Sequence, residues 1–222
     1  MPVRAAIPWV LPFAVFMLLL AVLPALGITE PWNALLWAVV LDVVLIVFSR
    51  GVIKLAPKHF FMSTAIGIGV FMFWIAPDAL WPDYRSHWLF SNSIVGIPAS
   101  GLDTAAQQDV ITLWLRAARA VLLVPILEEL FWRGWLPRTV DSFDDFQARP
   151  LGSYTTLSFW ATAVLFASEH GSYWDVGLLC GIVYNVWMAR TRSIADLIWT
   201  HAVTNACLSA YVVFAKQWQY WA

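Results

Sequence analysis

Long apolar stretches alternate with short polar segments along this chain. Seven of them are long and apolar enough to predict helices over residues 8–28, 32–50, 60–77, 110–138, 154–171, 173–190 and 194–215. A membrane-spanning helix needs about 20 mostly apolar residues. Only 12% of the residues are charged, against about 25% in a typical soluble domain. The sequence therefore predicts an all-α, polytopic membrane helix bundle with seven or eight transmembrane helices.

The positions of the Lys and Arg residues predict the orientation of this bundle. With the N-terminus in the cytoplasm, nine of the 13 basic residues lie on the cytoplasmic side, and only Arg85 and Lys216 lie clearly on the other side. Cytoplasmic loops of membrane proteins carry an excess of Lys and Arg. We therefore expect residues 1–222 to form one integral membrane domain with a cytoplasmic N-terminus. The first apolar stretch is longer than the apolar core of a signal peptide, about 7–15 residues, so we expect it to be retained.

Three features do not fit a simple row of spanning helices. The fourth stretch is too long for one span, and its first part carries Arg116 and Arg119 on one face. We expect this part to be an amphipathic helix at the membrane interface that leads into a span over 119–138. The segment 88–97 is too short to cross, and we expect it to dip partly into the membrane. Asp42 is alone in the second helix, where we expect it to pair with a neighbouring helix.

Residues 128–134, Glu-Glu-Leu-Phe-Trp-Arg-Gly, place three charged side chains in one of the most apolar parts of the chain. A charged side chain at the centre of a membrane helix costs at least about 2.5 kcal/mol, so these three need partners. Glu129 and Arg133 are four residues apart on one helix face and can form an ion pair. Glu128 points about 100° away from Glu129, because a helix has about 3.6 residues per turn. Its carboxylate is therefore free to face another helix.

Two further motifs place histidines in apolar helices. Phe166 lies one turn before His170 at the end of the fifth helix and can hold the imidazole by packing. His201 and Asn205 lie one turn apart in the last helix, so both can bind a single oxygen atom. Such residues can also serve only as hydrogen bonds between helices. Glu169 is a further acidic residue, which points away from His170 and is expected at the helix end.

Several other residues are interpreted as structural. Asn185 is expected to form an interhelical hydrogen bond, and Gly177 and Gly181 are expected to allow close packing of the sixth helix. Ser193, three residues before Asp196, is typical of a helix N-cap. The two cysteines lie in apolar segments without a Cys-x-x-Cys pair, and they predict neither a disulfide nor a zinc site.

The set of Glu128, His170, His201 and Asn205 indicates hydrolysis by an activated water molecule. The chain lacks the His-Glu-x-x-His zinc motif and the Gly-x-Gly-Asp motif of intramembrane aspartyl proteases. We expect Glu128 to act as general base, with His170 holding the water or a metal ion. We expect His201 and Asn205 to stabilise the oxyanion that forms on the carbonyl oxygen.

Together the three motifs resemble the CPBP family of intramembrane proteases, which are related to the type II CaaX prenyl endopeptidases and are also called the Abi family. Its signature is Glu-Glu-x-x-x-Arg, then Phe-x-x-x-His, then His-x-x-x-Asn or Asp, and all three parts stand in this order in the chain. Residues 190–194 are close to the family's Arg-Thr-Gly-Ser-Leu and depart from it at Arg192, where glycine is usual. The resemblance covers residues 110–210, which we expect to be the catalytic core. Length and Trp content are also similar to a bacterial subgroup, the CaaX prenyl protease-related proteins found with exosortase systems.

The resemblance implies a membrane-embedded endopeptidase whose site contains Glu128, Glu129, Arg133, His170, His201 and Asn205. It is compatible with a divalent metal ion, such as zinc held by Glu128, His170 and His201, and equally with a metal-free glutamate mechanism. The implied partners are the lipid bilayer and a protein or peptide substrate, lipidated or cleaved near its C-terminus. The implied location is a bacterial inner (plasma) membrane. The net charge of −1 gives no indication of nucleic acid as a partner.

Two other functions stay open at this point. One is a catalytically silent membrane scaffold or immunity protein of the same fold, and the other is a small transporter in which Asp42, Glu128 and Glu129 relay protons. The helix map also conflicts with a shared site. It places His170 towards the far side of the membrane and His201 nearer the cytoplasm, up to about 15–20 Å apart in depth at a rise of 1.5 Å per residue.

Overall fold

The structure, a computed structural model, describes residues 3–221. Over these residues the chain forms helices and loops, without a β-strand. The predicted all-α fold is therefore confirmed. Within the same residues, five helical stretches are long and apolar enough to cross a membrane: Val3–Leu26, Trp32–Ser49, Phe60–Leu80, Val110–Asp141 and Ile194–Ala215. The number of helices that actually span the bilayer stays a prediction.

The helices follow the predicted order closely. The α-helices are α1 (Val3–Val22), α2 (Trp32–Val44), α3 (Phe60–Leu80), α4 (Val110–Ala118), α5 (Val124–Glu129), α6 (Leu136–Asp141), α7 (Thr156–Ser168), α8 (Trp174–Thr191) and α9 (Ile194–Ala215). Short 3-10 helices are η1 (Leu23–Leu26), η3 (Tyr84–Ser86), η6 (Phe146–Ala148), η7 (Gly171–Tyr173) and η8 (Trp218–Tyr220), and π-helical segments are η2 (Leu45–Ser49), η4 (Arg119–Leu123) and η5 (Leu130–Trp135).

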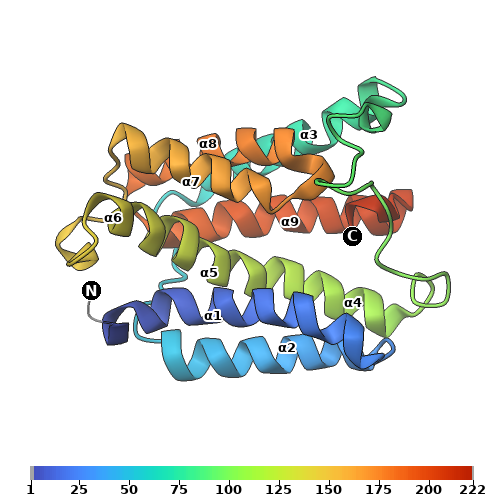
Figure 1. The fold of residues 1–222 in the computed structure, drawn as a ribbon, viewed down its shortest axis with the longest axis horizontal. Helices are drawn as coiled ribbons and strands as arrows, with labels where there is room; N and C mark the ends of the chain where they lie inside the picture. Colours follow the sequence, from blue (N-terminus) through green and yellow to red (C-terminus); the bar gives the residue numbers. More distant parts are fainter. Residues whose placement is uncertain (1–2, 222) are drawn as a thin grey trace.

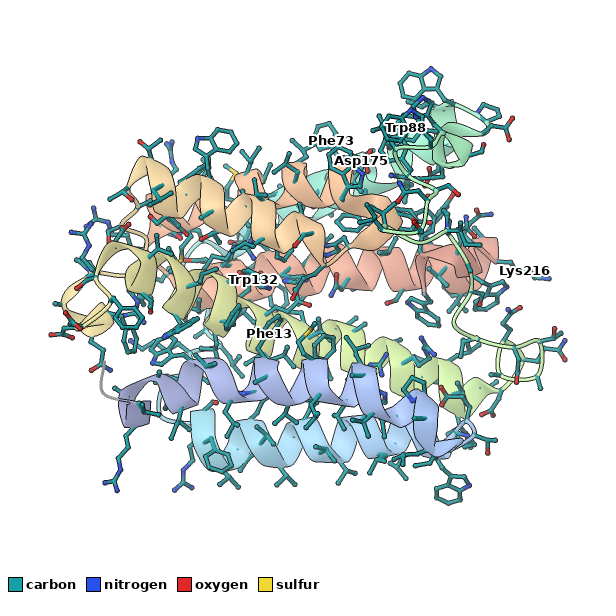
Figure 2. The ribbon with its side chains drawn as sticks, in the orientation of Figure 1. Phe13, Phe73, Trp88, Trp132, Asp175 and Lys216 are labelled. Carbon is teal, nitrogen blue, oxygen red and sulfur yellow. The ribbon has the colours of Figure 1, made fainter. Side chains whose placement is uncertain are left out.

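Most helices run along the longest axis of the molecule (Figure 1). α1 and α2 lie side by side on one side, and α3, α7, α8 and α9 form the other side, where α3 packs on α9 and α7 on α8. The rod formed by α4, α5 and α6 crosses obliquely between the two groups. Phe13 of α1 and Trp132 of the rod meet where these layers join, with ring centroids 5.4 Å apart (Figure 2).

The fourth predicted helix is one continuous rod from Val110 to Asp141. Its first part, α4, is an amphipathic helix that leads into the rest of the rod, as expected, and its position at the membrane interface stays a prediction. Arg116 pairs with Glu30 at 3.5 Å, and the Arg119 guanidinium lies 4.5 Å from the centroid of the Trp37 ring. Both arginines face the neighbouring α2 and the turn before it, so the polar face of α4 is covered by protein.

The π-helical segment η4 leaves a backbone carbonyl of this rod in need of a donor. The Val124 N–H donates to the Arg119 carbonyl, five residues back, as a π-helix requires. The next donor in this register would be Pro125, which has no N–H. The carbonyl of Ala120 is therefore available to a side chain from another helix.

The fifth predicted helix is shorter than expected. α7 has 13 residues and starts after a capping box in which the Thr155 and Ser158 side chains each accept from the other's backbone N–H. It ends at Ser168, and Gly171 then takes a left-handed φ of 52° that turns the chain into α8. The prediction extended this helix to residue 171 because hydropathy alone does not register the turn.

The outcomes for the other structural predictions differ. Ser193 caps α9 by accepting from the Asp196 N–H, as predicted. A Cβ atom on Gly181 would lie 3.2 Å from the Ala163 Cα in α7, so the expected close packing is confirmed. Asp42 does not pair with a neighbouring helix. Its side chain is exposed on α2, without a hydrogen bond or ion pair to any described residue.

Candidate active site

A cavity of about 410 Å³ lies between α3, the α4–α6 rod, α8 and α9. Four of the predicted site residues line it: Glu128, His170, His201 and Asn205. They come from three separate parts of the chain, so the fold brings together what the sequence keeps apart by up to 77 residues, from 128 to 205. Glu129 and Arg133 lie behind this wall, fully buried.

Glu129 is the centre of the buried polar network. Its Oε1 accepts from Arg133 Nη1 at 3.0 Å and is 2.8 Å from His201 Nδ1. The predicted Glu129–Arg133 ion pair is confirmed. The sequence missed the second contact, because nothing in the spacing of residues 129 and 201 links them. Since a carboxylate can only accept, His201 Nδ1 carries the proton in this contact, and Nε2 is the nitrogen left for chemistry.

Arg133 is held on three further sides. Its Nε donates to Asn185 Oδ1 at 3.2 Å, and its guanidinium carbon lies 4.3 Å from the centroid of the Phe166 ring and 5.3 Å from that of Tyr184. Asn185 also donates through Nδ2 to the Phe159 carbonyl of α7 at 2.9 Å, which confirms its predicted interhelical role. Phe166 therefore contacts the arginine as well as the histidine of its own motif.

His170 is fixed in one orientation. Its Nδ1 lies 2.8 Å from the Phe166 carbonyl, and its ring centroid lies 4.6 Å from that of Phe166 and 5.1 Å from that of Trp74. Because a carbonyl can only accept, Nδ1 must donate, which leaves Nε2 with a lone pair. On the remaining side, a Cβ atom on Gly177 would come within 3.2 Å of the ring. Gly177 is thus needed for the close approach of α8 to the imidazole.

Glu128 differs from its neighbour in having no fixed partner. The side chain is 9% exposed and lines the cavity, without a hydrogen bond or ion pair to any described residue. The predicted division between a paired Glu129 and a free Glu128 agrees with this geometry. A buried carboxylate without a partner is costly, so it points to a role that needs a free acid or base.

Asn205 is anchored to the rod by the carbonyl that Pro125 leaves free. Its Nδ2 donates to the Ala120 carbonyl at 2.8 Å. An amide nitrogen has two hydrogens, so one is left for a second acceptor in the cavity. The bond joins α9 to η4 and fixes the distance between the side of the cavity that carries Asn205 and the side that carries Glu128.

The expected separation of the two histidines in depth is wrong. Both line the same cavity. α7 ends at Ser168, earlier than predicted, so His170 lies less far across the bundle than the helix map placed it. His201 lies seven residues into α9, about 10 Å along its axis at 1.5 Å per residue. The three residues by which α7 ends early account for about 5 Å of the expected offset.

The donors of the cavity do not form a ready metal site. Among the described residues, no group of three or more His, Cys, Asp or Glu side chains is placed to hold a metal ion. His201 Nδ1 is taken by Glu129, and His170 Nδ1 by a carbonyl. The Nε2 atom of each histidine is left available, as it also is in metal-binding histidines, so a metal held by Glu128, His170 and His201 stays a prediction, and no step of the chemistry below depends on one.

Tyr184, Thr204 and Glu169 are among the cavity residues that were not predicted as part of the site. Tyr184 donates to Thr204 Oγ1 at 2.8 Å, and both line the wall beside His201. A tyrosine and a threonine in apolar helices are typical of packing, so the sequence carried no signal for them. Glu169 lies at the C-cap of α7, as expected for a helix end, but it also lines the cavity.

The comparison with known families agrees with this arrangement. Residues 110–207 match the family model described as type II CAAX prenyl endopeptidase Rce1-like. No curated protein and no solved structure matches the chain. The matched residues include all three motifs, from Glu128 to Asn205.

Proposed function

Because residues 110–207 match the family model described as type II CAAX prenyl endopeptidase Rce1-like, we propose that this protein is an intramembrane endopeptidase that hydrolyses a peptide bond of a membrane-associated protein or peptide. The observation that carries the proposal is the unpaired, nearly buried carboxylate of Glu128 in one cavity with His170, His201 and Asn205. Such a set can activate water and stabilise the charge that develops on a carbonyl oxygen.

Glu128 and His170 activate the water in this proposal. The Glu128 carboxylate takes a proton from a water molecule as the oxygen attacks the carbonyl carbon of the substrate. The His170 Nε2 lone pair accepts a hydrogen bond from the same water and so orients it. The proton on Glu128 then passes to the leaving amine as the C–N bond breaks, which returns the carboxylate to its starting state.

His201 and Asn205 bind the oxyanion of the tetrahedral intermediate. His201 donates from Nε2, and the Glu129 carboxylate on Nδ1 fixes the orientation of the ring. Asn205 donates the amide hydrogen that the Ala120 carbonyl does not use. Glu129 and Arg133 touch no reacting atom, and they act by holding His201 in position.

The orientation and the location complete the proposal. We place the protein in a bacterial inner membrane with its N-terminus in the cytoplasm, and the bias of Lys and Arg towards one side supports this orientation. The residues 50–58 and 138–154, which carry several of these charges, lie at the same end of the bundle as the N-terminus (Figure 1).

Purified protein in detergent tests this mechanism with a peptide library from a digested proteome, where new peptide ends are identified by mass spectrometry. We expect Glu128→Gln, which keeps the shape of the side chain, to lower cleavage about 10²–10⁴-fold, the usual contribution of a general base. Asp42→Asn removes a carboxylate outside the cavity and is the matched control. Cleavage by Glu128→Gln at the rate of the control would refute the role of Glu128. If the wild type cleaves no peptide and the Glu128→Gln variant keeps its function in the cell, the protein is a scaffold.

A further inference from the structure

Acidic side chains line the cavity wall without a basic side chain to balance them. Two carboxylates line it, Glu128 and Glu169, and its described lining contains no Lys or Arg. The third carboxylate nearby, Glu129, lies behind the wall and is balanced by Arg133. Glu128 is nine-tenths buried and has no partner among the described residues, so its carboxylate is open to a group that enters the cavity.

Glu169 extends this charge to the edge of the cavity. Its side chain is exposed although it lines the cavity, which places it at the mouth. Glu128 lines the same cavity. The two carboxylates therefore act on the same space.

A cation that contacts the cavity lining is already neutralised. Arg85 donates through Nη1 to the carbonyl of Ser172, a lining residue, at 2.7 Å. The same guanidinium pairs with two carboxylates, those of Asp78 and Asp175. A carboxylate brought in by a ligand would therefore meet two glutamates and no free guanidinium or ammonium group among the described lining residues.

The other walls suit the alkyl part of a basic side chain. Aromatic rings of Trp74, Phe166, Tyr173, Tyr220 and Trp221 line the cavity. Aromatic faces attract Lys and Arg head groups within about 6 Å of the ring centroid and also cover their methylene groups. The cavity thus combines an apolar, aromatic lining with carboxylates at its centre and its mouth.

We infer that the cavity takes an internal segment of the substrate that carries a Lys or Arg side chain next to the cleaved bond, and that it disfavours a free C-terminal carboxylate. The inference rests on the proposed peptidase function and deepens it by stating the substrate class. Glu169 is the specificity residue, because it faces the entering side chain without being needed for activation of the water. This preference differs from the C-terminal substrate that the family resemblance implies.

The test compares matched peptides derived from one cleaved library sequence. Three of them carry Lys, Met or Glu beside the cleaved bond. The fourth ends at the residue directly after this bond, with a free carboxylate. For the wild type we expect kcat/KM to be about tenfold higher with Lys than with Met, equivalent to about 1.4 kcal/mol, mainly through KM. Glu169→Gln should abolish this preference, Glu169→Asp should keep it, and Asp42→Asn should leave it unchanged. Equal kcat/KM for Lys and Met, or preferred cleavage at the free C-terminus, would overturn the inference while the peptidase proposal stands.

A binding measurement separates the two proposals if the wild type cleaves nothing. The Glu128→Gln protein is then titrated with four synthetic peptides that share one apolar sequence. Three are amidated and carry Lys, Met or Glu at one position, and the fourth ends in a free carboxylate. The rise in the melting temperature of the protein is measured for each peptide. Stronger stabilisation by the Lys peptide that disappears in the double variant Glu128→Gln, Glu169→Gln supports a basic ligand even without hydrolysis. Equal stabilisation by all four peptides overturns the inference.

Discussion

Replacement of Arg133 by methionine should destabilise the fold strongly. Arg133 is completely buried, and its removal leaves the Glu129 carboxylate, also completely buried, with His201 as its remaining partner. Removal of one member of a buried ion pair costs about 3–5 kcal/mol, because the other charge stays away from water. The lost contact with the Phe166 ring at 4.3 Å acts in the same direction. We therefore expect Arg133→Met to lower the free energy of unfolding by about 3–5 kcal/mol.

A second substitution identifies the stranded charge as the cause. In the double variant Arg133→Met, Glu129→Gln the carboxylate becomes neutral, and the new amide can still bond to His201. We expect the double variant to be more stable than the sum of the two single effects predicts, by about 0.5–3 kcal/mol, which is the usual range of coupling between residues in contact.

Unfolding of the purified proteins in mixed micelles, followed by tryptophan fluorescence, measures these free energies. Arg190→Met, which removes an exposed arginine near the end of α8, is the matched control. If Arg133→Met unfolds within about 0.5 kcal/mol of this control, the range of an ordinary surface substitution, the buried network does not stabilise the fold as argued. Additive effects in the double variant would show that the two side chains act independently.

Three further variants test single features of the structure. Gly177→Ala adds a Cβ atom 3.2 Å from the His170 ring. We expect about a tenfold loss of peptidase activity with little change in stability, because small displacements of catalytic groups are costly. The control Gly69→Ala, whose new Cβ atom meets no atom within 4 Å, should keep full activity. Asp42→Leu should stabilise the protein in lipid by about 2–3 kcal/mol in unfolding assays, since its exposed carboxylate lies within a helix that is long and apolar enough to span the membrane. A loss of stability would mean that the carboxylate has a partner in the membrane. Arg192 has a φ of 50°, where glycine is favoured, so Arg192→Gly should raise the free energy of unfolding by about 1 kcal/mol, and an unchanged value would show that no strain is relieved.

The sequence by itself determined the class of the protein and the position of its helices. Hydropathy is a local property, and a helix in lipid must satisfy its own backbone hydrogen bonds, so apolar length predicts a helix without knowledge of its neighbours. The pairing of Glu129 with Arg133 could also be predicted, because both residues lie on one helix, where a spacing of four places them together. The capping of α9 by Ser193 is local in the same way.

Only the tertiary structure decided how the site is assembled. The bond between Glu129 and His201 spans 72 residues, and the bond between Asn205 and the Ala120 carbonyl depends on a π-helical segment whose next donor would be Pro125. Neither follows from spacing, because the direction of a side chain from one helix relative to another is set by packing. The early end of α7, which shifts His170 towards the other site residues, likewise depends on a turn that an apolar pattern does not record.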